Sequence, residues 1–299
     1  MDKLTLRNTL LYTATLLVLV VLAISFFGMN VFVLLLVSFL GALPFEFLFS
    51  KIRKKPLDYA WMVHPLLIVL LLPPNAPWWL ALIASAFGVV FGKLIFGGSG
   101  KYIFPPSLVG ILFAYISFPS FITAIQWPIP SSDLVTGATP LMQLNRGQTL
   151  DVSWQQLLLG GAPGTLGETF RLGILLLGSF LFIMRVIDWK APVTYIGSVF
   201  VFTGIGHLVW PDTFRDPILS LLVGGLLFGA IFIAGDSAII PKSNRAKFIY
   251  GIGLGFLTVL IRHFATFPEG VTFSIIIMSA ISPLLDLDKA IEVKEVTHE

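Results

Sequence analysis

The sequence contains no cysteine among its 299 residues. This absence excludes disulfide bonds, iron–sulfur clusters held by thiolates of this chain, and a thiol nucleophile. Charge is also scarce, because Asp, Glu, Lys and Arg together make up only 12% of the residues. No G-x-G-x-x-G segment stands between a predicted strand and a helix, so the chain alone is not expected to take hydride from NADH.

Apolar side chains dominate what is present, at 56% of the residues. A soluble domain could not bury that fraction, so the composition predicts an all-α polytopic membrane protein. No long polar segment could form a second core, and residues 1–299 are expected to form one integral membrane domain. The first apolar run, 9–27, is long enough to span and lacks a small-residue cleavage site, so we expect no cleavable signal peptide.

The hydrophobic pattern predicts about ten spanning helices. Several runs are short for a 30 Å hydrocarbon core and are expected to be tilted, broken or packed inside the bundle. Five helices in 9–123 and five in 171–288 would form an inverted repeat, joined by the loop 124–170. The predicted spans are 9–27, 30–49, 59–73, 76–96, 105–123, 171–187, 191–210, 217–235, 247–264 and 270–288.

The distribution of Lys and Arg predicts the orientation of these helices. Of the 19 basic residues, 15 fall on the side of the N-terminus and 4 on the other side, and the richer side is expected to be cytoplasmic. Both termini are then cytoplasmic, and the loop 124–170 faces the outside of the cell (inner) membrane. The four basic residues on the outer side are Arg146, Arg171, Arg215 and Arg262.

One stretch in this loop has residue types suited to covalent modification. Residues 133–139 read D-x-x-T-G-A-T. The hydroxyl of Thr139 can accept a phosphate-linked group, and Gly137 and Ala138 leave the backbone open to a bulky enzyme. Asp133 is spaced to help such an enzyme recognise the segment, and Thr136 is the rival hydroxyl. The alternative is an ordinary Thr-Gly turn beside Pro140.

This stretch resembles the flavinylation motif of the RnfD/NqrB family, the membrane subunits of ion-pumping Rnf and Na⁺-translocating NADH:quinone complexes. The resemblance covers most of residues 55–290 and suits the shorter RnfD branch. It implies that Thr139 carries FMN through a phosphoester. The further matching segments are L-P-P-N-A-P-W-W at 72–79, F-G-G-S-G at 96–100, G-T-L-G-E-T at 164–169, and the closing segment 250–271.

The chain departs from the family pattern after the glycine-rich turn. The family reads F-N-P-A where this sequence has Phe104 followed by P-P-S. In the family these residues help to line a second, non-covalent flavin site that holds riboflavin. Losing the Asn removes a donor and an acceptor, so we expect a weakly held riboflavin near Tyr102, Phe104 and Lys101. After Ala234 the family has T-D-P, whereas this chain has G-D-S.

The resemblance implies a function as a membrane electron-transfer flavoprotein subunit of an Rnf-type ferredoxin:NAD oxidoreductase complex, coupled to Na⁺ or H⁺ translocation. Alone, the chain is not expected to complete a reaction. Expected partners are other membrane and soluble subunits, a flavin transferase and membrane lipid, with no nucleic acid. The alternatives are an RnfD-like flavin subunit of another transmembrane electron-transfer assembly, and a solute channel or transporter, since fold does not fix function.

Other polar residues keep two interpretations each. Glu168 and Thr169 either open a helix in an ordinary way or hold the FMN phosphate or ring edge. Arg262 either reaches the interface beside Glu269 or neutralises phosphate or reduced flavin. The three aspartates at helix ends either have an ordinary interfacial position or line a cation path: Asp58, Asp236 and Asp286. His64, inside an apolar run, is either a buried, hydrogen-bonded side chain or part of a proton path.

Overall fold

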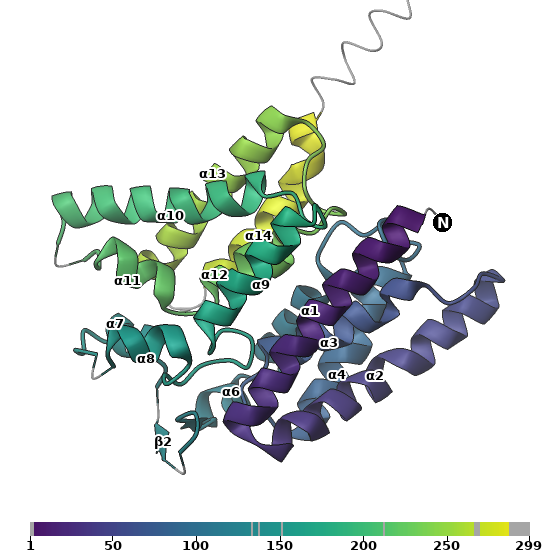
Figure 1. The fold of residues 1–299 in the computed structure, drawn as a ribbon, viewed down its shortest axis with the longest axis horizontal. Coiled ribbons are helices and arrows are strands. Elements are labelled where there is room, and N and C mark those ends of the chain that lie inside the picture. Colours follow the sequence, from purple (N-terminus) through teal and green to yellow (C-terminus); the bar gives the residue numbers. More distant parts are fainter. Residues whose placement is uncertain are drawn as a thin grey trace, which may run out of the picture.

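The chain is described from a computed structural model, which covers residues 3–132, 134–136, 138–150, 152–211, 213–265 and 270–286. Helices account for nearly all of its regular structure, in agreement with the predicted all-α membrane fold. Figure 1 shows the early helices, α1 to α4, gathered on one side and the later ones, α9 to α14, on the other, with a shorter-helix segment below them.

The first half places helices within the first five predicted spans. α1 and α2 are long, whereas the next segment is short and begins with a 3₁₀ turn, and the fourth ends as a π-helix. The elements are α1 (Lys3–Phe27), α2 (Met29–Arg53), η1 (Tyr59–Met62), α3 (Val63–Leu71), α4 (Trp78–Phe87), η2 (Gly88–Leu94) and α5 (Pro106–Ser117).

The second half places helices within the remaining predicted ranges. Residues 217–235 are broken: α11 ends at Leu222, Gly224 has a φ of 68°, and the helix resumes at Leu226. The elements are α9 (Arg171–Ile183), α10 (Lys190–Val209), α11 (Pro217–Leu222), α12 (Leu226–Phe228), η3 (Gly229–Ile233), α13 (Asn244–Phe264), α14 (Gly270–Ile281) and η4 (Ser282–Asp286).

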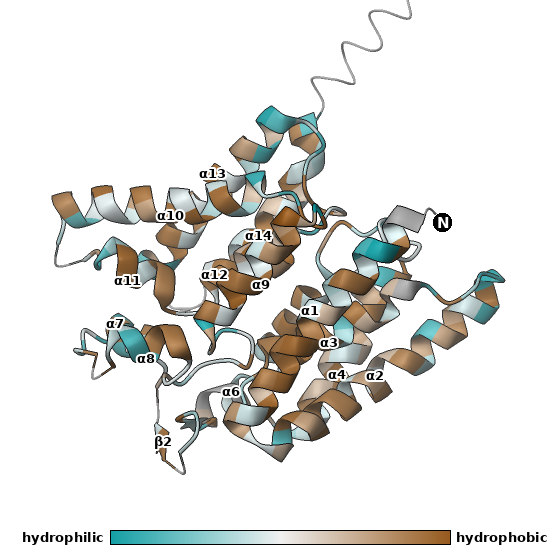
Figure 2. Cartoon of the chain, viewed as in Figure 1, coloured by the Kyte–Doolittle hydropathy of each residue, from teal (hydrophilic) through white to brown (hydrophobic). Residues whose placement is uncertain are grey.

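Only some of these helices have the length of an independent membrane span. In the described part of the chain four are both long and apolar enough: Thr5–Phe27, Met29–Arg53, Lys190–Val209 and Asn244–Phe264. Five others are apolar but have 10–17 residues, and Figure 2 shows hydrophobic colour along both classes. Short apolar helices must pack among longer ones, so that the backbone N–H and C=O groups at their ends find hydrogen-bond partners. The sequence predicts such packing for several of the apolar runs. The number of spans stays a prediction.

The packing order is similar in the two halves. α2 packs on α4 as α10 packs on α13, and α4 with η2 packs on α5 as α13 packs on α14. Some of these contacts are backbone to backbone: a Cβ added to Gly110 of α5 would lie 2.1 Å from the carbonyl oxygen of Ala84 in α4. Only glycine allows that approach. The pattern is compatible with the predicted inverted repeat, which stays a prediction.

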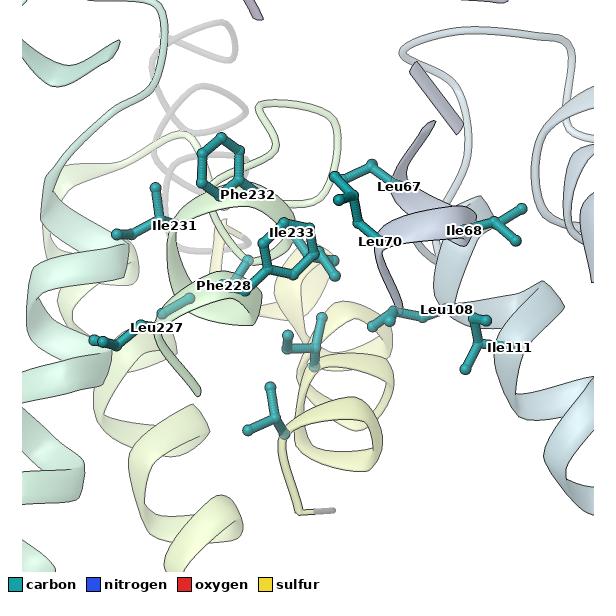
Figure 3. Packing of buried hydrophobic residues seen from close by; sticks show 14 of the residues in the cluster. Leu67, Ile68, Leu70, Leu108, Ile111, Leu227, Phe228, Ile231, Phe232 and Ile233 are labelled. Carbon is teal, nitrogen blue, oxygen red and sulfur yellow. The ribbon is translucent and has the colours of Figure 1, made fainter. Parts of the chain in front are cut away.

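Apolar side chains from both halves meet in one core. α3 and α5 contribute residues such as Leu70, Leu108 and Ile111, and α12 with η3 contributes Phe228 and Ile233. Figure 3 shows these side chains facing one another across the boundary between the halves. The core therefore joins the two halves along short and broken helices.

A buried ion pair stabilises the first half. Lys93 of η2 lies 2.6 Å from the carboxylate of Glu46 in α2, with side chains 1% and 4% exposed. The sequence did not predict this pairing, because Lys93 was counted among the basic residues of the loops. Pairing spares both groups much of the cost of an isolated charge in an apolar environment.

Candidate functional site

The candidate flavin-bearing loop has secondary structure of its own. It contains a two-stranded antiparallel ladder, β1 (Trp127–Pro128) with β2 (Val135–Thr136). Three short helices accompany it, namely α6 (Pro119–Ala124), α7 (Pro140–Asn145) and α8 (Trp154–Leu159). The amide of Ser131, near the tip of the hairpin, donates to the carbonyl of Phe26 at the end of α1 with a length of 3.0 Å. The loop is thereby attached to the first half.

Thr139 lies at the N-cap of α7. Its hydroxyl oxygen accepts a hydrogen bond from the amide of Met142, 3.3 Å away, and Pro140 follows at the first helical position, where no amide donor is needed. The Thr139 side chain is 6% exposed. Among the described residues the Thr139 hydroxyl is used only as an acceptor, which leaves its own hydrogen replaceable by phosphorus.

The rest of the predicted motif is only partly described. Thr136 ends β2, and its hydroxyl lies 3.4 Å from the carbonyl oxygen of Ala138 and 3.5 Å from the Ala138 amide, both at the edge of hydrogen-bond range. Ala138 is buried. Asp133 and Gly137 lie outside the described residues, so their predicted roles in recognition and access stay predictions.

The predicted segment 164–169 is fastened to the first half. The amide of Gly167 donates to the carbonyl of Leu70 and the amide of Leu166 to that of Leu72, at 2.6 and 3.1 Å. Glu168 is 4% exposed, and its carboxylate lies so close to Gly164 that a Cβ there would be 2.2 Å from Oε1. The segment therefore bridges the loop and the end of α3.

Thr169 is held by its own neighbours. Its hydroxyl donates to the carbonyl of Thr165 at 2.9 Å, and the side chain is 1% exposed. This contact favours a structural role for Thr169 over the predicted contact with a flavin phosphate. Glu168 instead borders a small recess of about 30 Å³ between the halves. The recess is also lined by Leu71, Leu108, Ile111, Tyr115, Thr165, Gly225, Gly229, Ile233, Val271 and Thr272.

Two buried arginines bind the end of α11, where the helix is broken. Arg262 of α13 donates to the carbonyls of Ser220 and Val223 at 2.8 and 3.1 Å. Arg171, the first residue of α9, donates to the carbonyl of Leu222. These side chains are 2% and 1% exposed. They satisfy carbonyls that the helix break leaves without intrahelical partners.

Arg171 also joins the candidate loop to the broken helix. Its Nη1 donates to the carbonyl of Leu157 in α8 at 2.8 Å and to that of Thr169 at 3.2 Å. Sequence reasoning counted Arg171 only as a loop charge. The available signal was its position directly before an apolar run, where a cation must find internal partners if it is buried.

A third arginine contacts α7. Arg215, between α10 and α11, donates from Nη2 to the side-chain oxygen of Asn145 at the end of α7. Burial, together with the nearby charge of Arg262, lowers the pKa of Arg215 to about 10. Arg215 was not predicted as a site residue, and nothing in its sequence context distinguishes it from an interfacial arginine.

The residues predicted for a second flavin have different surroundings. Lys101 is exposed and Tyr102 is buried. Tyr102 donates from its hydroxyl to a carboxylate oxygen of Asp236 at 2.6 Å. Phe104 instead borders an open apolar groove together with Phe87 and Phe113. The structure thus does not bring Tyr102 and Phe104 together around one recess.

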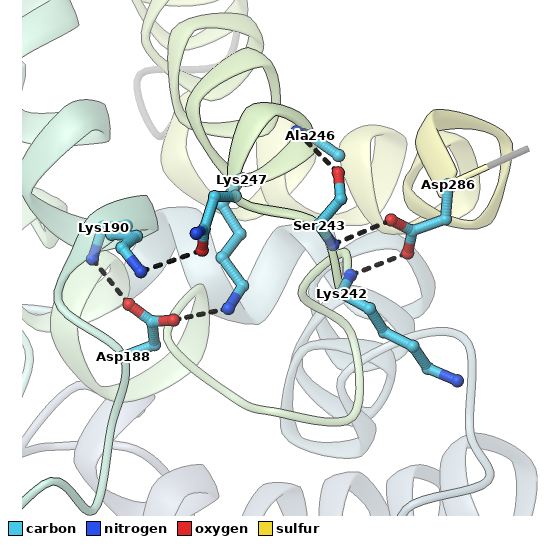
Figure 4. Close-up of polar contacts among 8 residues, drawn as sticks. Asp188, Lys190, Lys242, Ser243, Ala246, Lys247 and Asp286 are labelled. Atoms are coloured by element: carbon cyan, nitrogen blue, oxygen red, sulfur yellow. Dashed lines mark hydrogen bonds and ion pairs between the residues drawn. The ribbon is translucent and has the colours of Figure 1, made fainter. Parts of the chain in front are cut away.

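The acidic residues at helix ends have mostly structural contacts. Asp58 accepts from the amide of Ala60 at 3.1 Å, and Asp286 accepts from the amides of Lys242 and Ser243 at 2.7 and 3.0 Å (Figure 4). The described residues contain no group of three His, Asp or Glu side chains placed to hold a metal. His64 is 2% exposed, and neither ring nitrogen has a hydrogen-bond partner among the described residues. Glu269 lies outside the described residues.

Buried polar atoms near the candidate loop fit an anionic cofactor. Arg171 Nη2, Arg215 Nη1 and Arg262 Nε are buried without a hydrogen-bond partner in the part of the chain that the structure describes. Such donors suit phosphate, and the Thr139 hydroxyl suits an ester linkage. The residues present therefore fit the FMN that the motif implies.

Comparison with known proteins shows the family to which the chain belongs. The model of the NQR2, RnfD, RnfE family matches residues 2–292. The D subunit of the Na⁺-translocating ferredoxin:NAD⁺ oxidoreductase complex of Acetobacterium woodii is 33% identical, over 87% of this chain and 81% of that protein. The D subunit of the ion-translocating oxidoreductase complex of Ectopseudomonas mendocina is 34% identical, over 87% and 83% of the two chains. That of Aeromonas salmonicida is 30% identical over 92% of each. The chain is therefore a multi-pass membrane protein that belongs to the NQR2, RnfD, RnfE family.

Proposed function

We propose that this chain is the electron-carrying membrane flavoprotein subunit of an Rnf-type ferredoxin:NAD oxidoreductase complex, with FMN esterified to Thr139. The observation that carries the proposal is the D-x-x-T-G-A-T segment at 133–139, which ends on a hydroxyl that caps α7 and, among the described residues, is used only as an acceptor. Family membership and the names of the relatives, which are subunits of ion-translocating complexes, support it.

In this proposal the chain positions its cofactor and excludes water from it. Bound FMN supplies transfer of one or two electrons, which lets it connect a one-electron donor to a two-electron acceptor. Thr139 fixes the phosphate end, and α7 sets the direction of the loop from that point. The amides of Leu166 and Gly167 hold the loop against the end of α3. The Thr169 hydroxyl stabilises segment 164–169 by donating to the carbonyl of Thr165. Coupling to Na⁺ or H⁺ translocation is part of the proposal, and it is supported by relatives whose names describe Na⁺-translocating and ion-translocating complexes.

The proposed partners are other membrane and soluble subunits of such a complex, and a flavin transferase that loads Thr139. The proposed setting is the cytoplasmic membrane, with both termini cytoplasmic and the loop 124–170 outside. The asymmetry of the basic residues supports this orientation.

In-gel fluorescence of the denatured protein tests the flavin proposal. The wild type is expected to give a fluorescent band, Thr139→Ala to give none, and Thr136→Ala to keep it. Thr136→Ala is a matched control, because it removes the other hydroxyl of the same motif. A fluorescent Thr139→Ala band would refute the attachment point, and a dark wild-type band from cells that contain the transferase would favour the channel alternative.

Accessibility of single cysteines tests the orientation, since the natural chain has none. A membrane-impermeant thiol reagent is expected to label Gln148→Cys in intact cells and to leave Ser243→Cys unlabelled. The reverse pattern would invert the proposed topology.

A second, non-covalent riboflavin is proposed as weakly held. Acid precipitation is expected to release at most about one flavin per chain, while another stays attached. Tight retention of the releasable flavin through long detergent washing would show that the missing Asn beside Phe104 matters little. Complete absence of releasable flavin would mean that this subunit has one cofactor.

A further inference from the structure

Basic side chains gather where four helices begin or end. Arg7 of α1 donates from Nη2 to the carbonyl of Met184, directly after α9, at 3.3 Å. Lys190, the first residue of α10, donates from Nζ to the side-chain oxygen of Asn244, the first residue of α13, at 2.9 Å. The turn 184–190 connects these two contacts. We call the following residues the basic rim: Arg7, Arg185, Lys190, Arg245 and Lys247.

Most of the basic rim has no carboxylate partner in the part of the chain that the structure describes. Lys247 pairs with Asp188 at 2.5 Å, as Figure 4 shows. Arg7 and Lys190 have neutral oxygens as hydrogen-bond partners. Arg185 and Arg245 are exposed, and the described residues place neither in an ion pair. Four of the five cations are therefore available to an external anion.

The carboxylates on the adjoining segments already have other partners. Asp188 also accepts from the backbone amide of Lys190. Asp286 accepts from two backbone amides just before α13, and Asp236 accepts from a phenol. Lys190 and Arg245 lie in the first turns of α10 and α13, so the positive ends of two helix dipoles add to their charges. The rim thus has a positive potential that favours a bound anion.

Apolar side chains beside the basic rim indicate which anion it meets. Trp189, which precedes Lys190, is half exposed, and tryptophan is typical of the level at which lipid headgroups lie. Cations beside exposed apolar surface suit a phospholipid, because its headgroup and acyl chains are neighbours, whereas a soluble acidic protein has no use for that surface. Large apolar side chains are exposed in the adjoining turns: Leu10, Ile183, Val193, Phe248 and Ile249.

We propose that the basic rim binds the headgroup of an anionic phospholipid from the surrounding bilayer, with phosphatidylglycerol as the simplest case. Basic groups between membrane helices attract anionic headgroups. The forked guanidinium groups of Arg7, Arg185 and Arg245 match phosphate oxygens, with two parallel donors each. The acyl chains lie along the exposed apolar side chains of the same helices.

The lipid site is separate from the candidate flavin-bearing loop. Arg7 lies near the beginning of α1, whereas the loop is attached through Phe26 at its end. The inference therefore does not depend on the proposed function. A lipid in this place joins α1 of the first half to α9, α10 and α13 of the second, so it stabilises the contact between the halves.

Native mass spectrometry of the full-length chain in detergent tests the site, with phosphatidylglycerol compared with phosphatidylcholine of the same acyl chains. Phosphatidylglycerol is expected to bind more tightly, and its binding should weaken as salt screens the charges. Arg185→Gln and Arg245→Gln should each weaken it about fivefold. Both side chains are exposed, so both variants should fold, and their melting temperatures without lipid check this. Lys55→Gln, which removes an exposed lysine just after α2, is the matched control and should bind like the wild type.

Any of three results would overturn the proposal. Equal affinity for the two lipids would show that no headgroup is recognised. An equal loss in Lys55→Gln and in the arginine variants would mean that basic surface attracts lipid without a defined site. Preference for phosphatidylglycerol that appears only in the double variant Glu292→Gln with Glu295→Gln would show that these acidic residues, which lie outside the described residues, already occupy the rim.

Discussion

Tyr102 and Asp236 belong to opposite halves of the chain and are joined by a hydrogen bond of 2.6 Å, in which the phenol donates to the carboxylate. The His64 ring meets the edge of Tyr102, with ring centroids 5.5 Å apart. Tyr102 precedes α5 and Asp236 follows η3. This hydrogen bond therefore joins the two halves in addition to the apolar core.

Tyr102→Phe should destabilise the protein, because it keeps the ring and removes the donor to Asp236. The expected loss is about 1–3 kcal/mol, the usual cost of leaving a partly buried acceptor without its donor. Thermal melting in detergent measures it. In an Asp236→Asn background the same change should cost less; an equal loss in both backgrounds would show that the hydrogen bond contributes nothing.

Lys93→Met should be among the most damaging single changes, because it leaves the Glu46 carboxylate buried without its partner. Breaking a buried pair from one side costs about 3–5 kcal/mol. Fluorescence-detected gel filtration after heating measures the surviving folded fraction. The double variant Lys93→Met with Glu46→Met should recover much of the loss, and a double variant as unstable as the single one would argue against this explanation.

Gly110→Ala should disturb the packing of α5 on α4. The added Cβ would meet the Ala84 carbonyl, which belongs to the backbone and cannot turn aside, so we expect a loss of about 1–3 kcal/mol. Gly197→Ala in α10 is the matched control, since no atom lies within 4 Å of its added Cβ. Similar melting temperatures for the two variants would contradict the close approach.

The ion pair between Asp188 and Lys247, 2.5 Å long and drawn in Figure 4, predicts a pH dependence. Partial burial works to raise the pKa of Asp188, but hydrogen bonds from Lys247 and from the Lys190 amide outweigh it and leave that pKa below its ordinary value. Because the folded pKa is depressed, the contribution is present above the unfolded value of about 3.9 and lost as pH falls through the folded value.

Asp188→Asn should therefore lower the melting temperature slightly at neutral pH, in line with about 0.2–1 kcal/mol for a partly exposed pair. The difference from the wild type should shrink as the pH falls below about 4. Measuring both proteins across this range checks the sign. A difference that grows on acidification would mean that Asp188 is held by something other than Lys247.

The positions of the apolar helices were predictable because each coincides with an apolar run of the sequence, whereas the short helices α7 and α8 of the loop 124–170 were not predicted. The break between α11 and α12 could not be predicted, because Val223 and the two glycines that follow it lie inside an apolar run. The break is stabilised by hydrogen bonds from Arg171 and Arg262 to the carbonyls at the end of α11, and these contacts cannot be read from the sequence. Thr139 is predicted as the flavin attachment point from its motif alone, and that role stays a prediction. The pairing of Lys93 with Glu46 could not be predicted, because spacing along the chain does not say which residues of different helices meet.

The burial of Thr139 has a consequence for how copies of this protein mature. An enzyme that loads the proposed flavin must reach a hydroxyl that is only 6% exposed, with the buried Leu141 beside it. Loading then requires α7 to be undocked, either during synthesis or in brief local openings. Transferase added to folded, unmodified protein should act slowly, and faster on Leu141→Ala, whose α7 is less firmly packed. The fraction of flavin-bearing copies would then depend on the rate of flavin transfer relative to the rate at which α7 docks.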